Sequence, residues 1–155
     1  MTRLNLRGVD IYSQLLAPDA QLELLKQLRS VARAAPFAAP LTPQGKPMSV
    51  RMTSAGRYGW ASGPGGYHYA KTHPDGTGWP PIPPAALALW HMVTGVEREP
   101  ECCLINYYGE GARMGLHQDK DEADFQWPVV SISLGDDGLF RVGSVARGGP
   151  TASHW

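Results

Sequence analysis

The part of the chain after Pro100 constrains the fold most, because short apolar runs alternate there with turn-forming residues and no helical pattern intervenes. The runs cover residues 103–108, 112–119, 128–135 and 138–143. Short runs rich in Val, Ile, Tyr and Phe and bounded by Gly or Asp are typical of strands. Several such strands in succession build antiparallel barrels or jelly rolls. We therefore expect a sheet structure of this kind, with helices packed against its outside.

Two helices are predicted before this region. Asp19 can cap the first helix, and Pro36 closes it. Its apolar residues recur at near-helical spacing: Leu22, Leu25, Leu28 and Val31. The second helix follows Pro83 and Pro84, and Gly95 is placed to end it. Both are expected to have a structural role.

The segment between the two helices is rich in Gly, Pro and aromatic residues. Residues 48–54, 57–62 and 65–71 read as short strands joined by turns. We expect this segment to form a lid or a hairpin-rich wall.

Composition limits the class of protein. The chain has 155 residues, of which 43% are hydrophobic, enough for one core and one domain. The adjacent Cys102 and Cys103 cannot supply a disulfide framework, which favours a reducing cytoplasm. No stretch approaches the ~20 apolar residues of a membrane span. Acidic and basic residues number 14 each, so any contact with nucleic acid must come from a local patch.

The strongest chemical signal is the tripeptide His117-Gln118-Asp119 at the end of a predicted strand. Side chains at i and i+2 project from one face of a strand, so the imidazole and the carboxylate can meet at one point. Completed by a second His, such a pair forms the facial triad that holds non-haem Fe(II) with coordination positions left open. A zinc site that recruits His68 or His91 is an alternative, and the tripeptide alone occurs often by chance.

The surrounding sequence is more specific. The run CLINYYGEGARMGLHQDKDEADFQWPVVSISLG, together with MSVRMTSAGRYGWASGPGGYHYAK and the element Trp79-Pro80-Pro81, resembles the AlkB family of Fe(II)/2-oxoglutarate dioxygenases. The resemblance extends from about Pro36 onward. It implies an α+β, mostly β fold: a double-stranded β-helix (jelly roll) with N-terminal helices outside and a hairpin-rich nucleotide-recognition lid.

On this basis we expect a single domain covering residues 1–155. Its parts are an N-terminal helical region (1–47), the nucleotide-recognition lid (48–80), a supporting helix (81–99) and an incomplete jelly-roll core (100–155).

The resemblance also implies roles for individual residues. His117 and Asp119 correspond to iron ligands. Asn106 and Tyr108 match strand positions that hydrogen-bond 2-oxoglutarate, and Tyr107 lies between them. Without the resemblance, these three would be read as a barrel strand whose polar groups satisfy neighbouring backbone.

For the substrate, Trp60 matches an aromatic residue of the lid that contacts the base. Tyr67, His68 and Tyr69 follow it, and aromatic faces suit an extruded base. Asp121 matches a position near the exocyclic amine of the base. The alternative for the aromatic residues is ordinary packing within a hairpin, and the alternative for Asp121 is a solvated surface acid. Basic residues that could contact phosphate, if they are not simply solvated, are Arg51, Arg57, Lys71, Arg113 and Arg147.

The chain departs from the family pattern downstream of Asp119. The second iron-binding His and the two Arg residues that grip 2-oxoglutarate are not present, so we expect the final strands to be missing. His154 falls in a loop-like tail and is not expected to replace the missing ligand. Without these final strands a jelly roll would have exposed edges, so the chain is expected to be a fragment, the product of an interrupted gene or a degenerate paralogue. Two protein ligands without the Arg pair should hold iron and 2-oxoglutarate poorly.

The function implied is oxidative demethylation of N-alkylated bases such as 1-methyladenine and 3-methylcytosine, as direct repair of alkylation damage. The cofactor would be Fe(II), with 2-oxoglutarate and O2 as co-substrates. The expected partner is alkylated single- or double-stranded DNA or RNA, bound by a cytoplasmic monomer without a membrane segment. The alternative is a non-catalytic nucleic-acid-binding remnant of the same family.

Overall fold

The computed structural model describes most of the chain. The described residues are 1–42, 44–63, 66–74, 76–115, 117, 128–144 and 151–154.

The first predicted helix is confirmed as α1 (Pro18–Ala34), which buries Leu24 and Val31. Its N-cap is Ala17, and Asp19 lies in the first turn instead of capping the helix. A carboxylate there still interacts favourably with the N-terminal end of the helix dipole. The predicted start was therefore misplaced slightly, because Pro at the first helical position needs no side-chain cap for its missing N–H.

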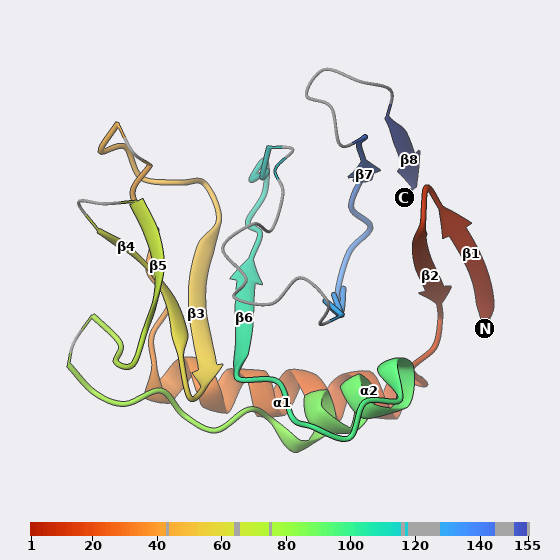
Figure 1. Cartoon of the computed structure of the whole chain (residues 1–155), viewed down its shortest axis with the longest axis horizontal. Helices are drawn as coiled ribbons and strands as arrows, with labels where there is room; N and C mark the ends of the chain where they lie inside the picture. Colours follow the sequence, from red (N-terminus) through yellow and green to blue (C-terminus); the bar gives the residue numbers. More distant parts are fainter. Residues whose placement is uncertain are drawn as a thin grey trace.

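The second predicted helix is confirmed as α2 (Pro84–Thr94). Gly95 ends it with φ of 69°, a left-handed conformation that favours glycine. Figure 1 shows α2 beside α1 below the strands, and the two helices are in contact. No helix in the described ranges is both long and apolar enough to cross a membrane.

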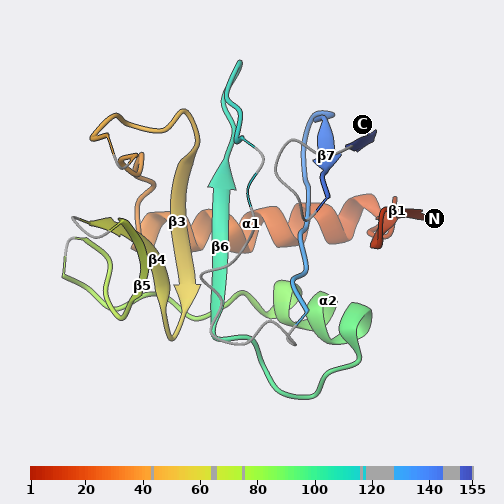
Figure 2. The same cartoon turned by 45° about the horizontal axis from the view of Figure 1, so that its top comes forward.

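The sequence did not predict an N-terminal hairpin, formed by β1 (Thr2–Leu6) and β2 (Val9–Ser13). Its turn, Arg7-Gly8, has positive φ at both residues, as the tight turns favoured in hairpins require. Leu4 and Leu6 pair with Ile11 and Val9 and alternate with the pair of Asn5 and Asp10, so a short alternating pattern is present on both sides of this turn and was overlooked. In both views the hairpin lies at the opposite side of the molecule from β3 (Figure 2).

Strands β3 (Arg51–Gly56) and β6 (Cys102–Tyr107) are distant in sequence but pair antiparallel. The face of this pair that carries Ala55 and Ile105 packs on Val31 of α1. Figure 2 shows both strands crossing in front of α1. Thr53 is buried, and its hydroxyl donates a 2.6 Å hydrogen bond to the carbonyl of Ala35 at the end of the helix. The pair is therefore anchored on α1 by apolar contact and by a buried hydrogen bond.

The predicted hairpin is formed by β4 (Gly59–Gly63) and β5 (Gly66–Ala70), and it lies beside β3 (Figure 1). The turn that leads into it is fixed by backbone hydrogen bonds. The Gly56 N–H donates to the Pro80 carbonyl at 2.8 Å, and the N–H groups of Arg57 and Tyr58 both donate to the Glu101 carbonyl, at 2.9 and 3.2 Å. The start of the hairpin is thus tied to the residues that precede β6.

The remaining strands are β7 (Phe140–Val142) and β8 (Ala152–His154), which pair with each other. His154 therefore lies in a strand and not in the loop that we expected. Two predicted strands are not observed: residues 112–115 and 128–135 are irregular, and no described strand pairs with either segment. Strand-forming residues adopt a regular strand only when a neighbouring strand satisfies their backbone groups. In the described part of the chain the strands pair two by two.

Candidate functional site

His117, the first predicted metal ligand, is exposed on the segment that follows β6. Its Nδ1 lies 2.9 Å from the carbonyl oxygen of Gly115. A carbonyl can only accept, so Nδ1 carries the proton of this hydrogen bond and the ring lone pair lies on Nε2. Metal-binding histidines are commonly held in this way, with the second ring nitrogen donating to a carbonyl. The tautomer therefore suits a metal ligand. Asp119 lies outside the described residues.

The zinc alternative gains no support from the other histidines. Nδ1 of His91 hydrogen-bonds to the carbonyl of Val96 at 2.7 Å, and its ring contacts Trp90 edge-on at 5.3 Å, so His91 closes the end of α2. His68 is exposed on β5. Within the described ranges no group of three His, Cys, Asp or Glu side chains could hold a metal ion.

Strand β6 presents its predicted cofactor residues on two faces. Tyr107 pairs with Arg51, and Asn106 pairs with Met52. Successive side chains alternate across a strand, so Asn106 and Tyr107 point in opposite directions. The Tyr107 ring contacts Phe37, with ring centroids 5.8 Å apart. Tyr107 therefore points away from the face that carries Asn106.

Tyr108 follows the last residue of β6 and is 51% exposed. Partial burial raises the pKa of its phenol above the usual value, because the charged form loses water. The phenol is thus protonated at neutral pH and can donate a hydrogen bond. Together with the amide of Asn106, it offers donors of the kind that bind a carboxylate or a keto oxygen.

The β4–β5 hairpin also has two different faces. Trp60 pairs directly with Tyr69, so their side chains share one face, whereas the pair of Ala61 and His68 lies on the other. The backbone of Tyr67 pairs with that of Ser62, but the Tyr67 side chain lies outside the described part. The hairpin therefore presents Trp60 and Tyr69 together and separates them from His68.

The face that carries His68 is backed by Trp79. A Cβ atom placed on Gly59 would overlap the Trp79 indole, so the indole packs directly on the glycine backbone. Its Nε1–H donates to the carbonyl of Ala70 at 2.9 Å. His73 is buried, contacts Trp79 edge-on at 5.2 Å, and hydrogen-bonds through Nε2 to the carbonyl of Pro36 at 3.0 Å. This support was not foreseen, because the sequence carries no local signal for contacts so far apart.

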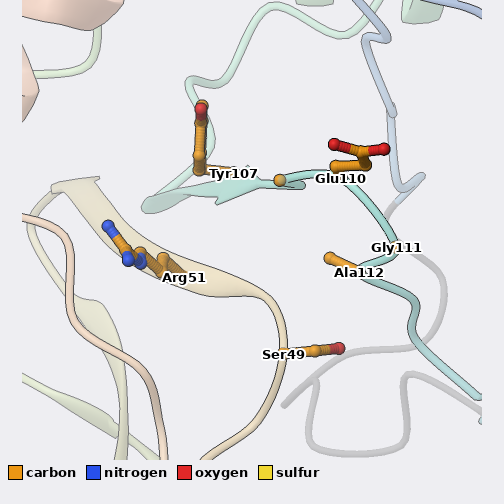
Figure 3. Close-up of a pocket in the computed structure, with 7 residues that line it drawn as sticks. Ser49, Arg51, Tyr107, Glu110, Gly111 and Ala112 are labelled. Atoms are coloured by element: carbon orange, nitrogen blue, oxygen red, sulfur yellow. The ribbon is translucent and has the colours of Figure 1, made fainter.

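A hollow of about 390 Å³ opens where β3 begins and β6 ends (Figure 3). Its lining residues are Ser49, Arg51, Tyr107, Gly109, Glu110, Gly111 and Ala112. Ser49 fixes the loop on one side: its hydroxyl donates to the Arg113 carbonyl at 3.0 Å and accepts from the Arg113 N–H at 3.2 Å. Sequence reasoning did not single out Ser49 or Glu110.

The predicted phosphate contacts differ in their surroundings. Arg51 lines the hollow, and Lys71 and Arg113 are exposed. Arg57 forms an ion pair with Glu101 at 3.7 Å beside a second hollow of about 610 Å³ near α2, so part of its charge is already compensated. Arg147 and Asp121 lie outside the described residues.

A model of the 2OG-Fe(II) oxygenase superfamily matches residues 8–155. The chain is 50% identical over 147 residues to a protein of Caulobacter vibrioides named alpha-ketoglutarate-dependent dioxygenase AlkB homolog, covering 94% of this chain and 67% of that protein. The chain belongs to the AlkB family of Fe(II)/2-oxoglutarate dioxygenases. The family predicted from the motifs is thus confirmed.

Two further relatives extend this comparison. The Escherichia coli alpha-ketoglutarate-dependent dioxygenase AlkB is 37% identical over 137 residues, which cover 85% of this chain and 63% of that protein. A protein of Arabidopsis thaliana named DNA N(6)-methyladenine demethylase is 29% identical over 160 residues, covering 88% of this chain and 35% of its own length. This AlkB-family chain spans about two thirds of the length of the bacterial relatives.

Membership of the AlkB family confirms the predicted enzyme class, the jelly-roll superfamily and the cofactors, which are Fe(II), 2-oxoglutarate and O2. The residues present fit this chemistry in part. The imidazole of His117 is of the type that binds Fe(II), and its bond to Gly115 leaves the lone pair on Nε2. Asn106 and Tyr108 carry hydrogen-bonding groups of the kind that would suit 2-oxoglutarate. The rest of the predicted ligand set falls on Asp119, beyond the described ranges.

Proposed function

We propose that this protein oxidatively removes N-methyl groups from bases of DNA or RNA, of the 1-methyladenine and 3-methylcytosine type. The observation that carries the proposal is the pairing of Trp60 with Tyr69 on one face of the hairpin, in a chain of the AlkB family. In the overall reaction, O2 and 2-oxoglutarate yield succinate and CO2, and the second oxygen atom hydroxylates the methyl group. The hydroxymethyl product then loses formaldehyde and leaves the unmodified base.

We infer the following roles near the metal. His117, through Nε2, and Asp119 would hold the iron, which supplies the activation of O2. The Asn106 amide and the protonated phenol of Tyr108 would hydrogen-bond 2-oxoglutarate and fix its orientation. Tyr107 is left out of this set, because it faces the opposite side of β6.

For the substrate, we infer that Trp60 and Tyr69 stack on a base that has left its helix. A base within a duplex cannot reach a metal in a protein site, so extrusion favours single-stranded or weakly paired substrates. Tyr67 and Asp121 are proposed to contact the same base, and Arg147 a phosphate. The name of the Arabidopsis relative supports a nucleic-acid substrate. His68 faces away from Trp60 and is a weaker candidate than we expected.

The arrangement of the domain follows from the same proposal. The β4–β5 hairpin would act as the lid, and residues 100–155 would belong to the jelly-roll core. Free thiols at Cys102 and Cys103 support the cytoplasm as the location. The monomeric state stays a prediction.

The proposal is tested by incubating the full-length protein with Fe(II), 2-oxoglutarate, air and an oligonucleotide that contains one 1-methyladenine. Mass spectrometry should show loss of one methylene unit, with one succinate formed per methyl group lost and no loss when 2-oxoglutarate is omitted. If the protein still binds the oligonucleotide after a chelator has removed the metal, and no methyl group is lost with metal present, the protein is a non-catalytic nucleic-acid-binding remnant.

The face assignment of the hairpin gives a second prediction. Trp60→Ala removes a stacking surface worth roughly 1–3 kcal/mol per base, so KM for the methylated oligonucleotide should rise about tenfold. His68→Ala, on the other face of the same hairpin, should change KM by less than about twofold. Steady-state kinetics of the two variants compare the faces directly, and equal effects would show that the register does not define the base-binding face.

A further inference from the structure

We propose that the hollow at the ends of β3 and β6 binds one nucleotide of the substrate strand outside the target-base site, on the face of the β3–β6 pair opposite Asn106. In this subsite Arg51 would contact the phosphate, Tyr107 would stack on the base, and Glu110 would accept a hydrogen bond from the base edge. The inference rests on the proposed nucleic-acid substrate, but it assigns residues that the reaction itself does not use.

Arg51 and Tyr107 are paired across β3 and β6. They are the first residue of β3 and the last of β6, and they face each other in the register, so their side chains lie on the same face. Arg51 is exposed and forms no ion pair within the described ranges. An uncompensated guanidinium beside an aromatic ring is a combination that suits a nucleotide, with its phosphate and its flat base.

The Tyr107 ring contacts a neighbouring ring and is still accessible to a ligand. The side chain is 54% exposed, yet its ring is held against Phe37 at 5.8 Å. A ring fixed in this way loses little conformational entropy when a base stacks on it. The exposed part of Tyr107 can therefore serve as a stacking platform.

The hollow is lined by one basic and one acidic side chain. Figure 3 shows Arg51 and Glu110 on different sides of the hollow, with Tyr107 near one edge. Glu110 repels phosphate but accepts hydrogen bonds from exocyclic amines or ring N–H groups. The opposite charges would thus orient the nucleotide, with its phosphate toward Arg51 and its base toward Glu110.

Size and position agree with a single nucleotide. About 390 Å³ lies at the small end of the range for ligand pockets. Gly109 and Gly111 line the hollow without side chains, and Gly111 has φ of 75°, which favours glycine. The same loop is tied down by Ser49 and leads on to His117. A nucleotide held here would be near the segment that carries the proposed metal ligand.

The phosphate contact is tested by fluorescence anisotropy with short single-stranded oligonucleotides that carry no methyl group, at several salt concentrations and without iron. Arg51→Ala should weaken binding about fivefold at low salt and reduce the slope of log affinity against log salt by about one. Arg51→Lys should keep the slope. Arg7→Asn is the matched control, because it removes an exposed arginine in the distant β1–β2 turn and asparagine tolerates the left-handed backbone there.

The base contact is tested with Tyr107→Leu, which should weaken binding about tenfold, and with Tyr107→Phe, which keeps the ring and should bind like the unchanged protein. In a single-stranded oligonucleotide with one 1-methyladenine, an abasic nucleotide at one fixed distance from that base should weaken binding to the unchanged protein but not to Tyr107→Leu. No binding by the unchanged protein, an unaltered slope for Arg51→Ala, or equal abasic effects in both proteins would overturn the proposal. If these results hold while no methyl group is removed, the subsite stands and the proposed reaction fails.

Discussion

The protein with His117 replaced by alanine is expected to lose at least about 100-fold in kcat/KM for demethylation, together with its affinity for Fe(II). Changes to residues that only orient metal ligands cost about 10- to 100-fold, so removing a ligand should cost at least as much. His117→Ala also ends the hydrogen bond of Nδ1 to Gly115, but this exposed contact contributes little to folding. Anaerobic Fe(II) titration and kinetics measure the two effects separately.

His154→Gln is the matched control for this prediction. His154 lies in β8, where its backbone pairs with Phe140, and we expect it to take no part in binding iron. Its replacement should leave Fe(II) affinity and kcat/KM within about twofold of the unchanged protein. A variant series in which His154→Gln loses iron and His117→Ala keeps it would show that the metal site has been assigned to the wrong histidine.

Gly59→Ala is expected to destabilise the protein by about 3 kcal/mol, near the upper end of the usual cost of overpacking. The new methyl group would overlap the Trp79 indole, which is held in place by the hydrogen bond to Ala70 and by contact with the ring of His73. Either Trp79 or the start of the β4–β5 hairpin must move. Urea unfolding followed by circular dichroism should show a lower midpoint with little change in slope.

Two further variants identify the cause. Gly78→Ala changes a glycine next to Trp79 in the chain, whose Cβ position meets no neighbouring atom, so it should alter stability by less than about 0.5 kcal/mol. In the double variant Gly59→Ala/Trp79→Leu the smaller side chain makes room, so the total loss should be about 1–3 kcal/mol below the sum of the single losses. Additive losses would mean that contact with Trp79 is not the reason for glycine at this position.

Local signals predicted some of the fold well. Helix α2 begins at Pro84 and ends before Gly95, as expected. Proline at the start and left-handed glycine at the end act through the backbone of their own residues, so the sequence shows them directly. The turns of the β4–β5 hairpin were also visible in the glycine-rich sequence. The β1–β2 hairpin was missed, although Leu4, Leu6, Val9 and Ile11 alternate with polar residues around the Arg7-Gly8 turn, because each alternating run is only a few residues long.

Long-range pairing was not predictable from one sequence. Nothing local in Arg51 or Tyr107 indicates that β3 and β6 pair, or in which register. Residues 128–135 have the composition of a strand, yet a strand also needs a partner, and none of the described strands pairs with them. Composition reports how well a segment suits a sheet but not whether a neighbour is present.

The sequence also predicted which residues belong to the candidate site, but not how their side chains are arranged. The family motifs identified His117, Asn106 and Trp60 as candidates, because these residues stand at fixed spacings in the chain. The face on which a side chain lies depends on strand bounds and register, so the separation of His68 from Trp60 became visible only in the structure. The hollow beside Arg51 is formed by two segments that meet only in the fold.

The imidazole of His117 and the carboxylate of Asp119 are expected to converge on one ferrous ion, beside the aromatic hairpin face. A crystal structure of the protein grown without oxygen, with Fe(II) and 2-oxoglutarate, tests this most directly. We expect iron bound to Nε2 of His117 and to Asp119, with 2-oxoglutarate near Asn106 and Tyr108. Iron held by other residues, or these two side chains turned away from each other, would contradict it.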